Sequence, residues 1–339
     1  MKQQRCWEIE TIVKSGFFKN PLWRWIAAGL IIIGFITYLS LLTGLFRKTG
    51  DRRQPQAGRE YLRIVDSYRR VVTLDQTPAR VVSAAPNITE IIFALGKEEI
   101  LVGRTDYCDY PAEACRIESI GDIMAPNLEK IVALNPDLVI ASTHFQKEVV
   151  AKLEDLGIKI AILDVEKSFD GVYQLIGQVG QVLGVDEKAA ELVSDMKRKV
   201  AEITEKVKDL PKPKVYYILF YGDGGFFTAG QDTFIGNMLQ MAGGDNAAAD
   251  SKGWQYSIEK LVEKDPDLLI CSKFYQTKEI ILETPGFKDL KAVKAGRILE
   301  IDHNLLDRQG PRLTEGLGTL AGMLHPEVFT DYQRKRSTP

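Results

Sequence analysis

A sixteen-residue pattern that occurs twice in the chain limits the possible folds more than any other feature. NLEKIVALNPDLVIAS at 127–142 and SIEKLVEKDPDLLICS at 257–272 are identical at eight of sixteen aligned positions. Each copy predicts a helix, a Pro-Asp stop and a buried strand. A weaker echo precedes each copy, at 85–96 and 229–244. Two α/β lobes of the same plan are therefore predicted, with chance recurrence of Pro-Asp helix stops as the alternative.

Residues 185–209 separate the N-terminal lobe, 61–184, from the C-terminal lobe, 210–330, and carry a helical apolar stripe. The apolar positions recur in steps of four and three, at Ala189, Val193, Met196, Val200, Ile203 and Val207. About 25 helical residues span roughly 37 Å, which is enough to cross a lobe. We expect a stiff connection that allows only a modest change in the angle between lobes. A coiled-coil partner helix is the weaker alternative, because the heptads are few.

The N-terminal region is unlike the rest of the chain. After a tail of residues 1–21, residues 22–46 are apolar and long enough to cross a bilayer, which takes roughly 20 residues. No small-residue cleavage site or cysteine follows, so a transmembrane anchor is predicted rather than a cleaved signal. Basic residues on both sides leave its orientation open. A polar linker, 47–60, leads to a hairpin predicted around Asp66-Ser67, and 331–339 form a polar tail.

Charge and cysteine content exclude several classes of protein. The 44 basic and 46 acidic residues give a net charge of -2, which offers no general attraction for nucleic acid. Four cysteines are too few for a disulfide-rich scaffold and lack zinc-binding spacing. Cys108 and Cys115 are close enough in sequence either to form a bridge or to remain two free thiols. Cys271 lies in an apolar run and is assigned to the core.

Several longer motifs resemble the substrate-binding proteins of ABC transporters for cobalamin, iron-siderophores and haem. They are RVVSAAPNITEIIFALG, VGRTDYCDYPAEA, IGDIMAPNLEKIVALNPDLVIAS, FFTAGQDTFIGNML, GWQYSIEKLVEKDPDLLI and GPRLTEGL, and together they extend over residues 80–320. The resemblance implies two Rossmann-like lobes, a rigid backbone helix, an extracytoplasmic binding domain, and an ABC permease dimer with its ATPase subunits as partner. TDYCDYP and WQYS are most similar to cobalamin-binding members. However, Met124 and Ser142-Thr143 stand where the cobalamin protein has tryptophans.

The expected ligand is therefore a corrinoid such as cobalamin, with haem or a ferric siderophore as the alternative. No separate cofactor is expected. In two-lobed α/β proteins ligands lie at the carboxyl ends of strands, where loops of both lobes face each other. Tyr107 and Trp254 are assigned to the apolar walls, and Asn304 and Arg308 to the polar rim. The full set of predicted ligand residues is Pro86, Asn87, Tyr107, Met124, Phe227, Trp254, Asn304 and Arg308, with Phe145, Tyr221 and Phe226 in comparable loops. Core packing is the alternative for each aromatic residue.

Three further residues receive specific hypotheses. His144, His303 and His325 have no second ligand at metal-binding spacing, so no preformed metal site is predicted. His303 lies in a predicted rim loop, where it either contacts the metal of a bound chelate or is simply solvated. Glu90 and Glu259 lie near the starts of helices in opposite lobes. The resemblance implies that they dock onto a permease; the plain alternative is favourable placement near a helix N-terminus.

An enzyme and a membrane-tethered sensor are the competing classes. The chain contains no GxSxG elbow, Walker A loop or GxGxxG after a strand. Residues 1–22, which precede the core of the predicted anchor, are too short for a signalling domain. We therefore expect a binding protein that supplies an importer.

Overall fold

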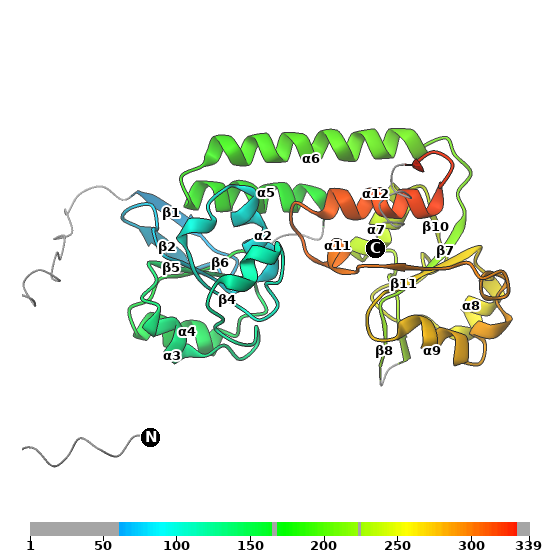
Figure 1. The fold of residues 1–339 in the computed structure, drawn as a ribbon, viewed down its shortest axis with the longest axis horizontal. Coiled ribbons are helices and arrows are strands. Elements are labelled where there is room, and N and C mark those ends of the chain that lie inside the picture. Colours follow the sequence, from blue (N-terminus) through cyan, green and yellow to red (C-terminus); the bar gives the residue numbers. More distant parts are fainter. Residues whose placement is uncertain (1–60, 165–167, 223–224, 331–339) are drawn as a thin grey trace, which may run out of the picture. The chain divides into compact units, whose positions relative to one another are not determined.

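Two four-stranded parallel sheets form the framework of the protein. The structure is a computed structural model that describes residues 61–164, 168–222 and 225–330. The strand orders are β4-β3-β5-β6 and β10-β7-β11-β12. Their bounds are β3 (Val81–Ser83), β4 (Leu101–Arg104), β5 (Leu138–Ala141), β6 (Ile160–Ile162), β7 (Lys214–Ile218), β10 (Asp245–Asn246), β11 (Leu268–Ser272) and β12 (Ile298–Ile301). The predicted α/β organisation with one parallel sheet in each lobe is confirmed (Figure 1).

The repeated pattern produces the same helix and strand in both lobes. α3 (Leu128–Ala133) leads to β5, and α8 (Ile258–Lys264) leads to β11. In both copies a polar side chain, Asn127 or Ser257, accepts a hydrogen bond from the backbone N–H three residues later and begins the helix. β5 and β11 both lie inside their sheets, where their apolar runs are buried on both faces.

Alternate residues of these central strands contribute to different apolar clusters. In β5, Leu138 and Ile140 belong to a large core that both lobes share, whereas Val139 and Ala141 face α3 and α4 (Lys147–Asp155). In β11, the even-numbered Leu268 and Ile270 join the shared core, and the odd-numbered residues face α8 and α9 (Thr277–Glu283). Because strand side chains alternate between faces, one face of each sheet packs against helices of its own lobe and the other face packs in the shared core.

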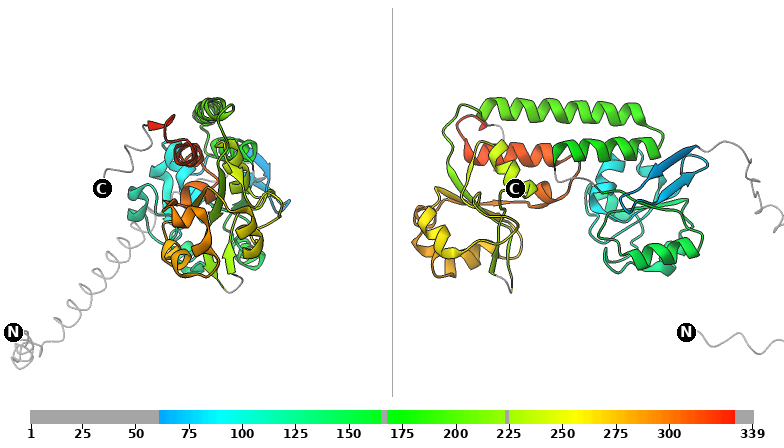
Figure 2. Two further views of the ribbon diagram at one scale, coloured as in Figure 1. Left: turned by 90° about the vertical axis from the view of Figure 1, so that its right-hand side faces the viewer. Right: turned by 180° about the vertical axis from the view of Figure 1, so that it is seen from behind.

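One long helix runs over the shared core. α6 (Asp186–Val207) buries Ala189, Met196, Ile203 and Val207. It lies along α5 (Phe169–Val182) of the first lobe and α12 (Leu313–Leu324) of the second (Figures 1 and 2). The helix predicted over 185–209 thus forms with slightly shorter bounds. The described residues belong to one compact unit, in which α6 bridges the two lobes.

The remaining elements surround these layers. β1 (Leu62–Val65) and β2 (Val71–Leu74) form the predicted antiparallel hairpin. Buried Asp66 holds its turn by accepting hydrogen bonds from the backbone N–H groups of Tyr68, Arg70 and Ile162. The others are α2 (Pro86–Ala94), η1 (Glu98–Ile100), η2 (Ala112–Arg116), β8 (Phe220–Gly222), β9 (Gly225–Phe227), α7 (Phe234–Met241), η3 (Phe287–Asp289), α10 (Lys291–Lys294) and α11 (Asn304–Asp307).

Several predictions concern cysteines and the membrane. Cys108 is a buried free thiol and Cys115 an exposed one, so the bridge considered above is absent in this structure. Cys271 is buried in β11, as predicted. No helix in the described part of the chain is long and apolar enough to cross a membrane. The anchor predicted over 22–46 lies outside that part.

Close contact between α5 and α6 yields a stability prediction. A Cβ at Gly180 would overlap the Cβ of Ala189, whereas a Cβ at Gly177, on the same helix, meets nothing within 4 Å. Gly180→Ala should therefore lower the free energy of unfolding by about 1–3 kcal/mol, because α5 and α6 must separate. Gly177→Ala should leave it unchanged or raise it by about 0.4–1 kcal/mol. Urea unfolding measures both, and equal stabilities would contradict the close helix contact.

Candidate inter-lobe binding site

Loops at the carboxyl ends of the two sheets contact each other. The loop after β4 carries Tyr107 and Asp109, and the segment after α11 carries Arg308 and Gln309. Arg308 Nη1 donates to Asp109 Oδ1 at 2.6 Å, and Nη2 donates to the Tyr107 carbonyl at 3.1 Å. Asn87 Nδ2, in the first turn of α2, donates to the Gln309 carbonyl at 3.4 Å. The predicted meeting of strand-end loops from both lobes is therefore present.

A buried carboxylate lies at the centre of these contacts. The Glu90 side chain is 2% exposed and belongs to α2 of the first lobe. It accepts hydrogen bonds from Arg308 Nη1, Arg312 Nε and Arg312 Nη2, each at 3.0 Å. Although burial opposes the charge of Arg308, hydrogen bonds to Asp109 and Glu90 raise its pKa. The Arg312 guanidinium also lies 3.8 Å from the ring centroid of Tyr110, so both arginines are held by first-lobe groups.

This burial corrects the role predicted for Glu90. A carboxylate shielded from solvent and bonded to two arginines has no free surface with which to meet a permease. Sequence reasoning missed this because the arginines lie more than 200 residues away from Glu90. Glu259 differs, since it is exposed in the first turn of α8. The repeat aligns Glu259 with Glu129, which is exposed in the first turn of α3 and was overlooked.

Exposed apolar side chains of the first lobe stand beside this ionic cluster. Tyr107 is 51% exposed and Met124 is 45% exposed, as suits two residues predicted to contact a ligand. Asp122 organises them by accepting from the Tyr107 hydroxyl at 3.2 Å and the Met124 N–H at 2.7 Å. The hydrogen bond to Asp122 raises the pKa of Tyr107.

The second lobe contributes an aromatic group that the sequence did not reveal. Tyr275 is 63% exposed and stacks on His303, with ring centroids 5.6 Å apart and an interplanar angle of 22°. It also meets Phe220 edge-on at 6.2 Å, and Phe220 stacks on the predicted residue Phe227 at 4.4 Å. Tyr275 has a φ of 62°, a conformation uncommon outside glycine that tends to occur at functional sites. Its position just after the second repeat was the available signal. Together Tyr107, Met124, Phe220, Tyr275 and His303 are called the inter-lobe surface.

His303 does not have the geometry expected of a metal contact. Its Nδ1 lies 2.8 Å from Ser272 Oγ, and its Nε2 lies 3.8 Å from Asp307 Oδ2. Burial lowers the pKa of His303 and raises the pKa of Asp307 to about 7. Both ring nitrogens therefore face protein groups. Among the described residues, no three His, Cys, Asp or Glu side chains are grouped to hold a metal ion.

The other predicted ligand residues are placed less directly. Pro86 is the first residue of α2, where its fixed φ suits a helix start. Asn304 begins α11 and is half-buried. Trp254 is half-buried against the shared core, and its carbonyl accepts from the Thr228 N–H at 2.8 Å. Phe145 is fully buried core. Tyr107 and Met124 are exposed, Phe227 packs on Phe220, and Arg308 belongs to the ionic cluster. That these residues bind a ligand stays a prediction.

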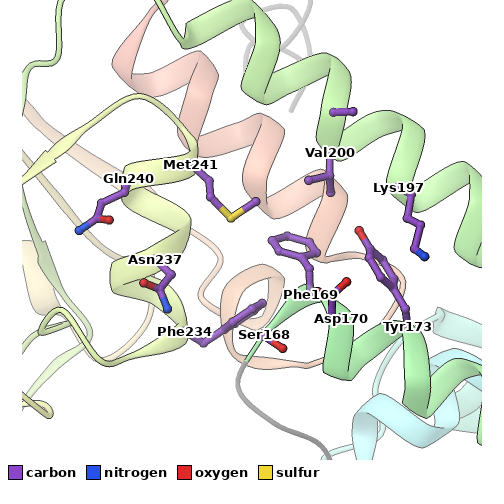
Figure 3. Close-up of a pocket in the computed structure, with 11 residues that line it drawn as sticks. Ser168, Phe169, Asp170, Tyr173, Lys197, Val200, Phe234, Asn237, Gln240 and Met241 are labelled. Carbon is purple, nitrogen blue, oxygen red and sulfur yellow. The ribbon is translucent and has the colours of Figure 1, made fainter.

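A separate cavity of about 570 Å³ lies where α5, α6 and α7 approach one another (Figure 3). Phe169 of the first lobe and Phe234 of the second contact each other in its wall, with ring centroids 5.4 Å apart. None of the predicted ligand residues lines this cavity. Because its walls come from both lobes and the bridging helix, its shape depends on the angle between the lobes.

The protein has two α/β lobes that are each built on a parallel sheet, one bridging helix, and an inter-lobe surface rich in aromatic residues. These features define a two-lobed solute-binding protein. The family model described as periplasmic binding protein matches residues 81–305. The chain therefore belongs to the periplasmic binding protein family, which is a family of substrate-binding proteins of ABC transporters.

Individual relatives agree with this assignment. The chain is 35% identical over 274 residues to an uncharacterized ABC transporter substrate-binding lipoprotein of Bacillus subtilis, covering 79% of this chain and 87% of the relative. It is 30% identical over 273 residues to a cobalamin-binding protein of Halobacterium salinarum, covering 77% and 73%. The periplasmic heme-binding protein from Roseiflexus sp. RS-1, in apo form, has a TM-score of 0.67 and 30% identity, covering 74% of this chain and 98% of that one.

The ionic cluster yields a prediction about stability. Glu90→Ala leaves two buried guanidinium groups without their shared carboxylate and should cost about 3–5 kcal/mol in the free energy of unfolding. Glu118→Ala removes the partner of Lys130 from an exposed pair and should cost at most about 1 kcal/mol. Chemical denaturation of both variants tests the difference. Similar losses in the two variants would show that Glu90 contributes no more than a surface ion pair.

Proposed function

We propose that the protein captures cobalamin or a related corrinoid outside the cytoplasm and delivers it to the permease of an ABC importer. The observation that carries the proposal is that the loop with exposed Tyr107 contacts the segment after α11, while exposed Tyr275 stacks on His303 just before that helix. A large flat macrocycle needs apolar and aromatic walls with a few polar groups at its rim. The cobalamin-binding relative supports this choice of ligand.

Haem or a ferric siderophore is the second candidate ligand. It is favoured by the structural similarity to a heme-binding protein at 30% identity, and the same aromatic walls suit a porphyrin. In either case the segment predicted to cross the membrane, 22–46, would keep the receptor near its permease. The lipoprotein relative supports a membrane-attached receptor, although the attachment named there is different.

We also propose a docking surface that uses one carboxylate from each lobe. Glu129 and Glu259 occupy the same position in the two repeats, in the first turn of α3 and α8. Val132 and Val262, one turn further along, are 44% and 42% exposed. Residues three apart lie on the same helix face, so each lobe presents an acid beside an exposed valine. A permease dimer with two-fold symmetry and basic residues could engage both copies alike.

Ligand binding by the two tyrosines can be measured directly. The purified chain should bind a corrinoid with sub-micromolar affinity and without turnover. Tyr107→Ala and Tyr275→Ala should each weaken binding by about 1–3 kcal/mol, or roughly 5- to 150-fold in Kd, because each removes an aromatic contact. Tyr61→Ala, an exposed tyrosine in another part of the first lobe, is the control and should not change Kd. Calorimetry that detects haem or siderophore binding but no corrinoid binding would select the second candidate.

Docking can be separated from ligand binding in cells. Glu129→Lys combined with Glu259→Lys should abolish corrinoid uptake, because the introduced lysines would face the basic residues proposed on the permease. The Kd for the corrinoid and the melting temperature should remain unchanged. Glu148→Lys combined with Glu279→Lys is the matched control. These two exposed acids also lie in first turns, of α4 and α9, one per lobe. Normal uptake by the first double variant, or equal loss in both, would argue against the proposed surface.

A further inference from the structure

We infer that the inter-lobe surface selects its chelate by charge, accepting an amide-rimmed corrinoid and rejecting a macrocycle whose rim carries several carboxylates. This inference rests on the proposed function and narrows it to one ligand class. It depends on how the charged side chains next to the aromatic walls are already paired within the protein.

The cations beside the surface are occupied by protein acceptors. Arg308 donates to Glu90, Asp109 and the Tyr107 carbonyl. Arg312 uses Nε and Nη2 for Glu90, and its flat face covers Tyr110. Lys273, which lies over the Phe274 ring, pairs with Asp302 at 2.8 Å. Each of these three cations already has a carboxylate partner, so a ligand carboxylate would have to share the cation with a protein carboxylate.

Carboxylates, in contrast, lie directly against the aromatic side chains. The negative charges of Asp122 and Asp106 both act on the Tyr107 hydroxyl. Hydrogen bonds from the backbone N–H groups of Met124 and Ala125 lower the pKa of Asp122, so it remains ionised. Across the surface, the negative charge of Asp302 acts on His303, which lies under Tyr275. A further negative group placed here would meet like charges.

This arrangement distinguishes two kinds of rim. Haem carries two propionates, and many ferric siderophores are anionic. The carboxylates of the inter-lobe surface would repel the negative charges of either ligand. The amides of a corrinoid are neutral, and their N–H groups can donate to carboxylates such as Asp109 and Asp122. Asp109 is central because it is 56% exposed at its side chain while it holds Arg308. It can therefore contribute to the charge met by an entering ligand.

The test compares two corrinoids of the same ring and different rim charge. Binding of cyanocobalamin to the full-length protein is measured beside binding of a derivative in which rim amides have been hydrolysed to carboxylates. The carboxylated corrinoid should bind at least about tenfold more weakly at low salt, because it meets uncompensated carboxylates. The difference in affinity should shrink as ionic strength rises. The distance over which exposed charges act falls to about 10 Å at 0.1 M salt and becomes shorter at higher salt.

Two charge-neutralising variants locate the effect. Asp109→Asn keeps the side-chain shape, removes one negative charge and leaves Arg308 with one carboxylate partner fewer, so it should narrow the difference between the two corrinoids. Asp195→Asn, an exposed acid paired with Arg198 on α6, makes the same change in net charge and should leave the difference intact. Equal affinity for the two corrinoids would overturn the charge selection while the corrinoid function stands. Tight haem binding with neither corrinoid bound would overturn both proposals together.

Discussion

The carboxylate of Glu90 is the interaction on which the relation between the two lobes depends. It is buried on a first-lobe helix, and both of its arginine partners come from the second lobe. A buried charge is tolerated only when it is paired and hydrogen-bonded, so the folded state requires Arg308 and Arg312 to lie against α2. Their position in turn brings the loops that carry Tyr107 and Asp109 against the segment after α11. The ligand surface is therefore arranged by an electrostatic constraint beside it.

A second connection acts through apolar packing. α6 covers one helix from each lobe, and the shared core extends from β5 to β11 beneath it. The lobes are thus joined by apolar helix packing on one side and by an ionic cluster at the strand ends. A change in lobe angle must deform both, which supports the expectation that ligand binding alters this angle only modestly. Selectivity in such a receptor must come mainly from surfaces that already exist before the ligand arrives.

The sequence predicted local and repeated features well because their causes lie within a few residues. The duplicated pattern predicted α3 with β5 and α8 with β11, and the apolar stripe predicted α6 to within two residues at each end. The rule about strand ends led to Tyr107 and Met124, whose side chains are exposed; that they contact a ligand stays a prediction. Glu90 was assigned to the surface because its burial depends on arginines that are distant in the sequence. The contacts of the two His303 ring nitrogens with Ser272 and Asp307 could not be predicted either, because they depend on how the chain folds around the ring. Tyr275 could have been found, since the second repeat ends three residues before it.

The turn of the first hairpin has a mechanical consequence. Asp66 fastens the β1–β2 hairpin to the end of β6 through a buried carboxylate, and Tyr61 immediately precedes β1. Any pulling force that the preceding chain transmits therefore enters at this hairpin, where the Tyr61 N–H is bonded to the Leu74 carbonyl. The force reaches the first-lobe sheet before it can act on the bridging helix. If the chain before Tyr61 is attached to a membrane as proposed, such a force would act first on the hairpin and the first-lobe sheet, and only afterwards on the contacts between the lobes.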